Sequence, residues 1–535
     1  MEELKRFLWW QSGIIYQIYP LSYMDSDGDG IGDLRGIRSK LDYLQWLGID
    51  AVWISPIFPS PMKDFGYDIS EYTDIDPRFG TMSDFHALLD DAHARNIKVI
   101  LDFVPNHTSD QHPWFIESRF SRDNPKRDWY LWQEPKPDGD PPNNWLSVFG
   151  GSAWQFEPQT GQYYYHAFLK EQPDLNWRNA DAQRAMLDIM RFWLGKGVDG
   201  FRVDVMAHLI KDAQLRNNPK NPDYRETDLP FRVLIPAYSM HQPEVHELVA
   251  KMRRVTEEYQ ERVLIGEIYL PITELVTYYG LKEPGAHLPF NFQLISLPWE
   301  APRIAAAITE YEAALPENGW PNWVLSNHDK SRIASRVGAD QARVAAMLLL
   351  TLRGTPTIYY GDEIGMPDVD VPRDRVHDPL EKNVPGRGLG RDKARTPMQW
   401  DGTQTGGFTS GKPWLPISPD HQYLNVESER ENPQSMLRLY RRLIALRRSE
   451  PALSVGNYAP VESEGDIVAY IREYESRRML VVANLGHRPQ SVPLRQMVIR
   501  TLLSTHVHRE NESIQDTLEL RSDEAVIAEI IRGET

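Results

Sequence analysis

Three carboxylic acids, Asp204, Glu267 and Asp329, each follow a short apolar run of the chain. Carboxyl groups can act as nucleophiles and as general acids. Other polar residues occupy similar positions, and the full set is Asp102, Asn106, His107, Arg202, Asp204, Glu267, His328 and Asp329. A single acid after a strand often caps a helix, but that explanation is weak for a whole set. The pattern therefore predicts one site built from several strand ends.

The spacing of these residues indicates a reaction type. Arg202 and Asp204 are two residues apart in a predicted strand, so their side chains point to the same side. A neighbouring guanidinium lowers the pKa of a carboxyl group, and we expect Asp204 to be an ionised nucleophile. Glu267 ends the apolar run VLIGE with no cation adjacent in sequence, which favours a protonated general acid. Such a pair, ~5–5.5 Å apart, cleaves glycosidic bonds with retention.

The elements that must position these residues are eight short apolar runs alternating with helical patterns. Buried parallel strands have this character, and strand ends converge on one face of a (β/α)8 TIM barrel, which is the fold class we predict. Pro289 and Pro298 crowd the sixth run. The runs are Ile14–Tyr19, Ala51–Ile54, Val99–Val104, Gly200–Val203, Val263–Ile268, Phe290–Ile295, Trp323–Leu325 and Thr357–Tyr360.

Two parts of the chain do not follow the strand–helix alternation. Residues 108–178 are polar, aromatic and rich in proline, too long for a loop, and we predict a subdomain inserted after strand three. Short alternating strands from residue 459 predict a C-terminal all-β domain, a β-sandwich over 459–535. The barrel itself is then formed by residues 1–107 and 179–458.

Composition excludes several classes of protein. The net charge of −17 argues against nucleic acid as a partner, and the absence of cysteine removes thiol catalysis and fits a reducing cytoplasm. The N-terminus does not resemble a signal peptide, and no membrane span is evident, so we expect a cytoplasmic protein. The 16 tryptophans and 24 tyrosines suit the apolar faces of sugar rings, although core packing alone would explain them.

Four segments carry a family resemblance. DFVPNH, GFRVD, GEIY and SNHD, which begin at Asp102, Gly200, Gly266 and Ser326, resemble the signature segments of the α-amylase family of glycoside hydrolases (family 13), in the same order. The N-terminal segment QIYPLSYMDSDGDGIGDLRGI and RTPMQW are similar to the α-glucosidase and oligo-1,6-glucosidase branch. The resemblance implies a nucleophile, an acid/base and a transition-state stabiliser in Asp204, Glu267 and Asp329, and a glucose subsite lined by His107, Arg202 and His328.

The same resemblance implies a closed substrate pocket. Asp64 and Tyr67, in DFGYD, and Arg395, in RTPMQW, are expected at the far end of the glucose subsite, where Arg395 would pair with Asp64. A pocket closed in this way admits only a chain end, which predicts exo action. Phe149 and Phe168, in the inserted subdomain, are predicted to wall the site.

The segment DSDGDGIGD, which begins at Asp25, is similar to a calcium-binding loop. Oxygen donors at alternate positions suit a hard cation, and the repulsion between carboxylates is costly without one. The segment departs from the EF-hand pattern because position twelve is Gly36. We predict a structural Ca²⁺, with Mg²⁺ as the alternative ion, bound by Asp25, Asp27, Asp29, the Ile31 carbonyl and Asp33.

Together these patterns predict an exo-acting, retaining α-glucosidase that acts on short α-glucosides. Val205, directly after the predicted nucleophile, favours α-1,6 linkages in the resembling branch, so an oligo-1,6-glucosidase is one alternative. A transglucosylase or sucrose isomerase would share every catalytic residue. The alternative from another class is a non-catalytic partner protein, which the complete carboxylate set disfavours. The sequence leaves the oligomeric state open.

Overall fold

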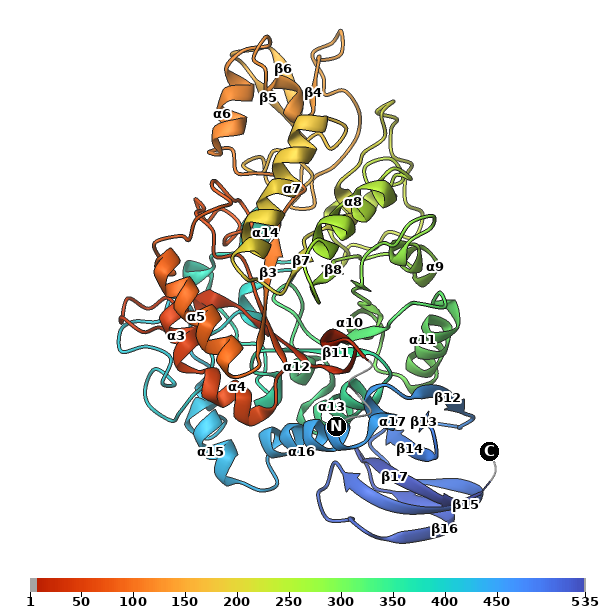
Figure 1. The fold of residues 1–535 in the computed structure, drawn as a ribbon. Coiled ribbons are helices and arrows are strands. Elements are labelled where there is room, and N and C mark those ends of the chain that lie inside the picture. The colour runs from red at the N-terminus through yellow and green to blue at the C-terminus, as the bar shows by residue number, and fades with distance from the viewer. Residues whose placement is uncertain (1–6, 534–535) are drawn as a thin grey trace.

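The computed structural model describes residues 7–533. Eight parallel strands form a nearly closed barrel in the order β10-β11-β1-β2-β3-β7-β8-β9 (Figure 1). The predicted fold class is confirmed. Almost every residue of these strands is buried, because helices cover the outside and side chains fill the inside. The strands are β1 Ile15–Ile18, β2 Ala51–Ile54, β3 Lys98–Phe103, β7 Gly200–Val203, β8 Val263–Gly266, β9 Leu288–Pro289, β10 Asn322–Val324 and β11 Thr355–Tyr359.

The sixth barrel strand differs from the prediction. It is β9, only two residues long, and the predicted run Phe290–Ile295 instead leads into a helical turn. Pro289 has no N–H to donate, which limits pairing with the next strand. The side chain of Asn322, in β10, bridges the gap: it accepts from the Asn291 N–H at 3.0 Å and donates to the Pro289 carbonyl at 2.5 Å.

Helices cover the outside of the barrel (Figure 1), and several of them begin at a residue whose side chain caps the helix. Asn179 caps α7 by accepting from the N–H groups of Asp181 and Ala182. The helices are α1 Trp9–Ser12, α2 Pro20–Tyr23, α3 Leu34–Ser39, α4 Leu41–Leu47, α5 Met82–Ala94, α6 Pro113–Phe120, α7 Ala180–Gly195, α8 Val245–Glu257, α9 Ile272–Leu275, α10 Gln293–Ser296, α11 Ala301–Ala314, α12 Ile333–Val337, α13 Ala339–Thr351, α14 Pro379–Asn383, α15 Val426–Glu431, α16 Met436–Ser449 and α17 Pro451–Ser454. No helix of residues 7–533 is long and apolar enough to cross a membrane.

Between β3 and α7 the chain leaves the barrel. It forms α6 and a small antiparallel sheet of β4 Trp132–Gln133, β6 Gln162–Tyr165 and β5 Trp154–Glu157, at the top of Figure 1. Trp145, Trp154 and Tyr165 pack together in a separate core. Other aromatic residues of this segment, such as Phe115 and Tyr130, belong to the large apolar cluster of the barrel.

The C-terminal strands form one antiparallel sheet in the order β12-β13-β14-β17-β15-β16, at the bottom of Figure 1. The expected all-β domain is confirmed, and its described strands are hydrogen-bonded into a single sheet; the sandwich packing stays a prediction. Residues of one face belong to the apolar cluster of the barrel, and residues of the other face form a separate buried apolar cluster. Register shifts interrupt the pairing of β15 with both of its neighbours. The strands are β12 Asn457–Val461, β13 Ile467–Tyr474, β14 Arg477–Asn484, β15 Gln490–Ser504, β16 Ser513–Leu520 and β17 Ala525–Arg532. The outer ends of the predicted domains, residues 1–6 and 534–535, lie outside the described residues.

Candidate active site

A cavity of about 780 Å³ lies at the carboxyl ends of the barrel strands, the face where a barrel of this kind places its active site. Nine residues predicted from the sequence line this cavity: Asp64, Tyr67, His107, Phe149, Phe168, Asp204, Glu267, His328 and Asp329. Arg202 and Arg395 are fully buried behind the cavity wall. The structure therefore brings together residues from loops after β2, β3, β7, β8 and β10, and from the inserted subdomain.

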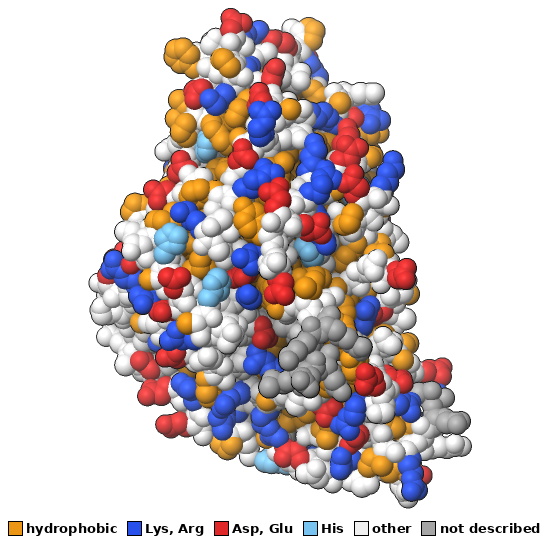
Figure 2. Space-filling view, viewed as in Figure 1, with side chains coloured by type: hydrophobic (Ala, Val, Ile, Leu, Met, Phe, Trp, Pro, Cys, Tyr) orange, Lys and Arg blue, Asp and Glu red, His pale blue; other side chains and the backbone are white. Residues whose placement is uncertain are grey.

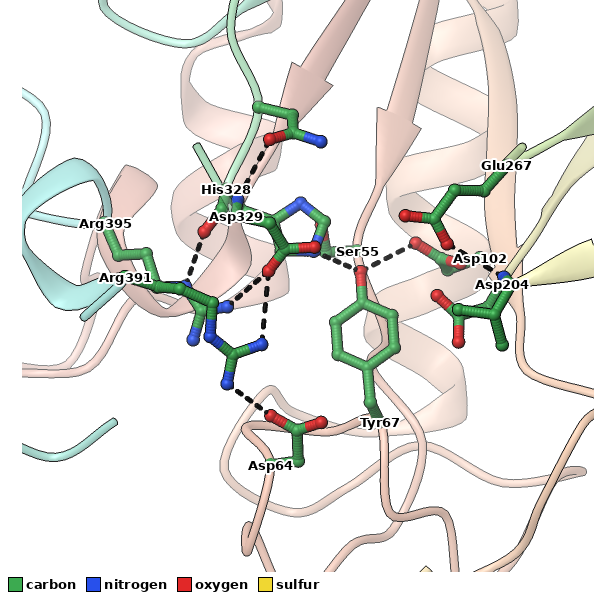
Figure 3. Close-up of polar contacts among 12 residues, drawn as sticks. Ser55, Asp64, Tyr67, Asp102, Asp204, Glu267, His328, Asp329, Arg391 and Arg395 are labelled. Atoms are coloured by element: carbon green, nitrogen blue, oxygen red, sulfur yellow. Dashed lines mark hydrogen bonds and ion pairs between the residues drawn. The ribbon is translucent and has the colours of Figure 1, made fainter. Parts of the chain in front are cut away.

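Arg202 stands at the centre of three carboxylates. Its Nη1 atom lies 2.9 Å from Asp102 Oδ1 and 2.6 Å from Asp204 Oδ1. Its Nη2 atom lies 2.9 Å from Glu267 Oε1. The two acids predicted to perform the chemistry thus bind the two terminal nitrogens of one guanidinium, and Figure 3 shows them side by side. A cation does lie beside Glu267, although none is adjacent in sequence.

This sharing changes the electrostatics that the sequence predicts for Asp204. Burial and the carboxylates of Glu267 and Asp102 raise the pKa of Asp204, and Arg202 opposes them without cancelling their effect. The expected lowering of that pKa is therefore wrong, because the guanidinium serves three acids at once. Burial also raises the pKa of Asp102 to about 6. Since full ionisation would leave two uncompensated negative charges, we infer that the cluster retains a proton near neutral pH.

The backbone of Val205 connects Asp204 and Glu267, the two acids predicted to react. Its φ of 39° and ψ of 46° fall in the left-handed region, which β-branched residues seldom adopt. In this conformation its N–H donates to Glu267 Oε2 at 2.8 Å. Backbone strain of this kind persists only where surrounding packing imposes it, and it commonly occurs at active sites.

Tyr67 and His328 form one wall of the cavity. Their rings stack with centroids 5.3 Å apart, and the Tyr67 hydroxyl lies 2.8 Å from His328 Nε2 and 3.1 Å from Asp102 Oδ2 (Figure 3). Burial lowers the pKa of His328 to about 3 and that of His107 to about 4, so both rings are neutral at ordinary pH. His107 Nε2 lies 3.0 Å from the Tyr67 carbonyl, which fixes its ring beside the same wall.

One end of the cavity, which we call the closed end, is sealed by ion pairs. Arg391 Nη2 lies 2.7 Å from Asp64 Oδ1, and Arg391 Nη1 lies 3.2 Å from Asp329 Oδ1 (Figure 3). The expected pairing of Arg395 with Asp64 is wrong. Arg395 instead donates to Asp329 Oδ1 at 2.9 Å and to the His328 carbonyl at 2.7 Å. Both arginines lie in the loop after β11, four residues apart, and sequence spacing within a loop does not show which one reaches Asp64.

The arginines also determine the charge of Asp329. Burial alone would raise its pKa, but the positive groups around it outweigh burial and hold the pKa well below the usual range. Because His328 is neutral at ordinary pH, Arg391 and Arg395 are the cations that persist there. Asp329 is therefore a fixed negative charge facing the cavity.

The two predicted aromatic walls are where the sequence places them. Phe149 and Phe168 both line the cavity, and their rings lie 6.3 Å apart with nearly perpendicular planes. Phe168 also contacts the ring of His107, and the Arg391 guanidinium lies 5.0 Å from the ring of Phe149. The inserted subdomain thereby contributes one side of the cavity.

The N-terminal acidic loop lies outside this cavity. Carboxylate oxygens of Asp25, Asp27 and Asp29 lie within 4.8 Å of one another. Asp33 lies outside that group: its carboxylate accepts from the N–H groups of Ser26 and Gly36 and caps α3. Three of the predicted ligands are thus gathered in one place, while Asp33 has a structural task of its own.

Known proteins resemble this chain over most of its length. The family model for the alpha amylase catalytic domain matches residues 17–456, and that for the alpha-amylase SusG C-terminal domain matches residues 467–527. A probable alpha-glucosidase of Rhizobium meliloti (strain 1021) is 42% identical, covering 89% of each chain. An oligo-1,6-glucosidase of Parageobacillus thermoglucosidasius is 39% identical, covering 98% of this chain and 99% of its own. The crystal structure of the alpha-glucosyl transfer enzyme XgtA is 40% identical, with a TM-score of 0.94 over 98% of this chain and 100% of that one. The chain therefore belongs to the alpha-amylase family.

Proposed function

We propose that this protein is an exo-acting, retaining α-glucosidase that releases terminal α-linked glucose from short saccharides. The observation that carries the proposal is the placement of Asp204 and Glu267 on the two terminal nitrogens of Arg202, in a cavity that Asp64 and Arg391 seal at one end. Relatives named alpha-glucosidase and oligo-1,6-glucosidase, which are 39–42% identical, support it. A sealed end admits the terminal glucose and leaves no room for a chain that continues beyond it.

The geometry suggests a two-step mechanism. Asp204 attacks the anomeric carbon while Glu267 donates a proton to the leaving oxygen, which forms a covalent glucosyl–enzyme. This step requires the proton retained by the buried cluster to be on Glu267 and requires Asp204, which Arg202 contacts at 2.6 Å, to attack as the carboxylate. Glu267 then accepts a proton from water, which releases glucose from Asp204. Asp329, held ionised, stabilises the positive charge that develops on the sugar ring.

Chemical rescue tests the two roles separately. We expect Asp204→Gly to lose activity on p-nitrophenyl α-glucoside and to form a β-glucosyl azide from an activated glucosyl fluoride when azide is added. Glu267→Ala should instead accumulate glucosyl–enzyme and release an α-glucosyl azide. Azide products of the opposite configurations, or an unreduced turnover in either folded variant, would contradict these assignments. Wild-type enzyme should release α-glucose first, as followed by ¹H NMR.

Linkage and transfer remain alternatives within the same chemistry. Val205 favours an α-1,6 preference, and a transglucosylase or sucrose isomerase would use the same acids. Incubation with maltose, isomaltose and concentrated sucrose distinguishes them. Free glucose as the main product supports the hydrolase, whereas a dominant isomer or transfer product supports the alternatives.

A basic surface for a polyanionic partner is not evident on the face in Figure 2, where acidic and basic side chains are intermingled.

We also propose a structural Ca²⁺ in the N-terminal loop, with Mg²⁺ as the alternative. Asp25, Asp27 and Asp29 would supply carboxylate oxygens, and the Ile31 carbonyl and Asp33 are the remaining predicted ligands. The oxygen-only donor set fits a hard cation. Partial desolvation raises the pKa of Asp29 although the residue is exposed, and the neighbouring carboxylates add to that effect through the repulsion that a cation would remove.

A further inference from the structure

The catalytic cavity has a second end that differs chemically from the closed end. We call it the leaving-group end, and its lining includes Tyr269, Lys330, Arg232 and Glu274. Tyr269 follows Glu267 by two residues, and Glu267 is the group that would protonate the leaving oxygen. Residues beyond Glu267, away from the Asp64–Arg391 pair, therefore face the part of the substrate that departs.

Lys330 is the unusual residue at this end. Within residues 7–533 its ammonium forms no ion pair and no hydrogen bond, although Asp329 and Glu267 act on it electrostatically. It lies 5.2 Å from the centre of the Tyr269 ring, a distance at which a cation is attracted to an aromatic face. Burial lowers the pKa of Lys330, and Asp329 opposes that shift.

The platform beneath Lys330 is rigid. The ring of Tyr269 stacks on that of Phe292 with centroids 4.1 Å apart and planes at 11°. Asn327 Nδ2 donates to the Tyr269 hydroxyl at 3.1 Å, and Asn327 Oδ1 accepts from the Asp329 N–H at 3.0 Å. The tyrosine is thus tied to the chain segment that carries Asp329 and Lys330, which limits where the ammonium can lie.

An ammonium carries three N–H donors, and withdrawing it from water without acceptors is unfavourable. Here no described protein group accepts from it, and the side chain is only half-buried at the cavity, so hydroxyl groups of a bound sugar can replace water as its acceptors. A departing sugar presents several hydroxyl oxygens close to the bond that breaks, whereas an aryl leaving group presents none in that position.

We propose that Lys330 determines leaving-group specificity by donating hydrogen bonds to hydroxyl groups of the departing sugar. The same contact would hold an incoming sugar when glucose is transferred to an acceptor other than water. The inference rests on the proposed α-glucosidase function, because it presupposes that Glu267 marks the side from which the leaving group departs.

The test compares one saccharide with one aryl substrate. Lys330→Met keeps most of the length of the side chain and removes its charge and donors. We expect kcat/KM for maltose or isomaltose, relative to that for p-nitrophenyl α-glucoside, to fall roughly ten- to hundredfold, mainly through a higher KM. Lys330→Arg keeps a cation and should restore part of the ratio. Lys282→Met, at an exposed lysine outside the cavity, is the matched control.

The outcomes separate the inference from the proposed function. An equal loss on both substrates would show that Lys330 acts only on structure or on the reacting acids, and unchanged kinetics on both substrates would show that it does not contact the sugar. Either result overturns the inference while wild-type activity stands. If Lys330→Met does not fold, Lys330→Gln replaces it. A wild type inactive on every α-glucoside would instead contradict the proposed function.

Discussion

Two clusters of carboxylates in this molecule are neutralised in different ways. In the catalytic cavity the chain supplies its own cations: Arg202 lies within 2.9 Å of oxygens from Asp204 and Glu267, and Arg391 binds Asp64. In the N-terminal loop, no lysine or arginine of the described residues pairs with Asp25, and its carboxylate accepts instead from backbone N–H groups and Thr409. A buried guanidinium fixes the positions of the carboxylates that it binds, whereas carboxylates held by backbone amides in a loop can also bind an ion.

From this comparison we expect the loss of Arg391 to lower activity more than the loss of any other described cation apart from Arg202. Arg391→Met would leave Asp64 buried without its partner and would remove one of the two cations on Asp329. Removing one member of a buried pair costs about 3–5 kcal/mol, and we expect kcat/KM to fall by roughly 10²–10³-fold. Steady-state kinetics on both p-nitrophenyl α-glucoside and maltose measure the effect.

The loss should be similar on the two substrates, because the closed end contacts only the glucose that they share. Arg391→Lys, which retains a charge without the fork geometry, should recover part of the activity. A loss confined to maltose would place Arg391 on the leaving-group side and would contradict our division of the cavity.

Acid should weaken the catalytic cluster through its histidines. The pKa values of His107 and His328 in the fold, about 4 and about 3, lie below the ordinary 6.5. Between pH ~4 and pH ~6.5 these histidines bind more protons in the unfolded chain than in the folded protein. The stability that they contribute above pH ~6.5 is therefore lost as the pH falls toward ~4. The expected loss is on the order of 3 kcal/mol for His107. Thermal unfolding measured between these pH values should show it.

The variant His107→Gln isolates this contribution. It should be less stable than wild type at neutral pH but should lose less stability on acidification. His508→Gln, at an exposed histidine in the loop between β15 and β16, provides the matched control and should follow the wild type. Equal pH slopes in wild type and His107→Gln would mean that His107 is not held neutral by burial.

Sequence reasoning reached the barrel and most of the cavity, because both depend on local patterns. Seven barrel strands are apolar runs that are recognisable by themselves, and the acids follow these runs. The two-residue β9 was missed because it depends on the side chain of Asn322, from a distant part of the chain. The charge of Asp204 and the partner of Asp64 were wrong for the same reason. Both depend on which groups are neighbours in space, and neither burial nor loop geometry follows from spacing.

The smallest expected effect concerns the second cluster. If Ca²⁺ binds the N-terminal loop, millimolar Ca²⁺ should raise Tm by roughly 2–5 °C, because an ion that binds only the folded state at ~100 times its Kd adds about 2.7 kcal/mol. The loop is already shaped for binding: Asp25 accepts from the Gly28 and Gly30 N–H groups at 2.8 Å, and Gly30, with a φ of 94°, packs against the Lys412 carbonyl.

Differential scanning calorimetry with added Ca²⁺, Mg²⁺ or EGTA measures this shift. Asp27→Asn should reduce the response to the ion, and Asp138→Asn, at an exposed acid of the inserted subdomain, should leave it unchanged. A flexible set of oxygen ligands suits Ca²⁺ better than Mg²⁺, which requires near-octahedral geometry, so Ca²⁺ should give the larger shift. If neither ion shifts Tm, backbone amides alone compensate the charge of the loop carboxylates. Both carboxylate clusters would then be neutralised by groups of the chain itself, by arginines in the cavity and by amides in the loop.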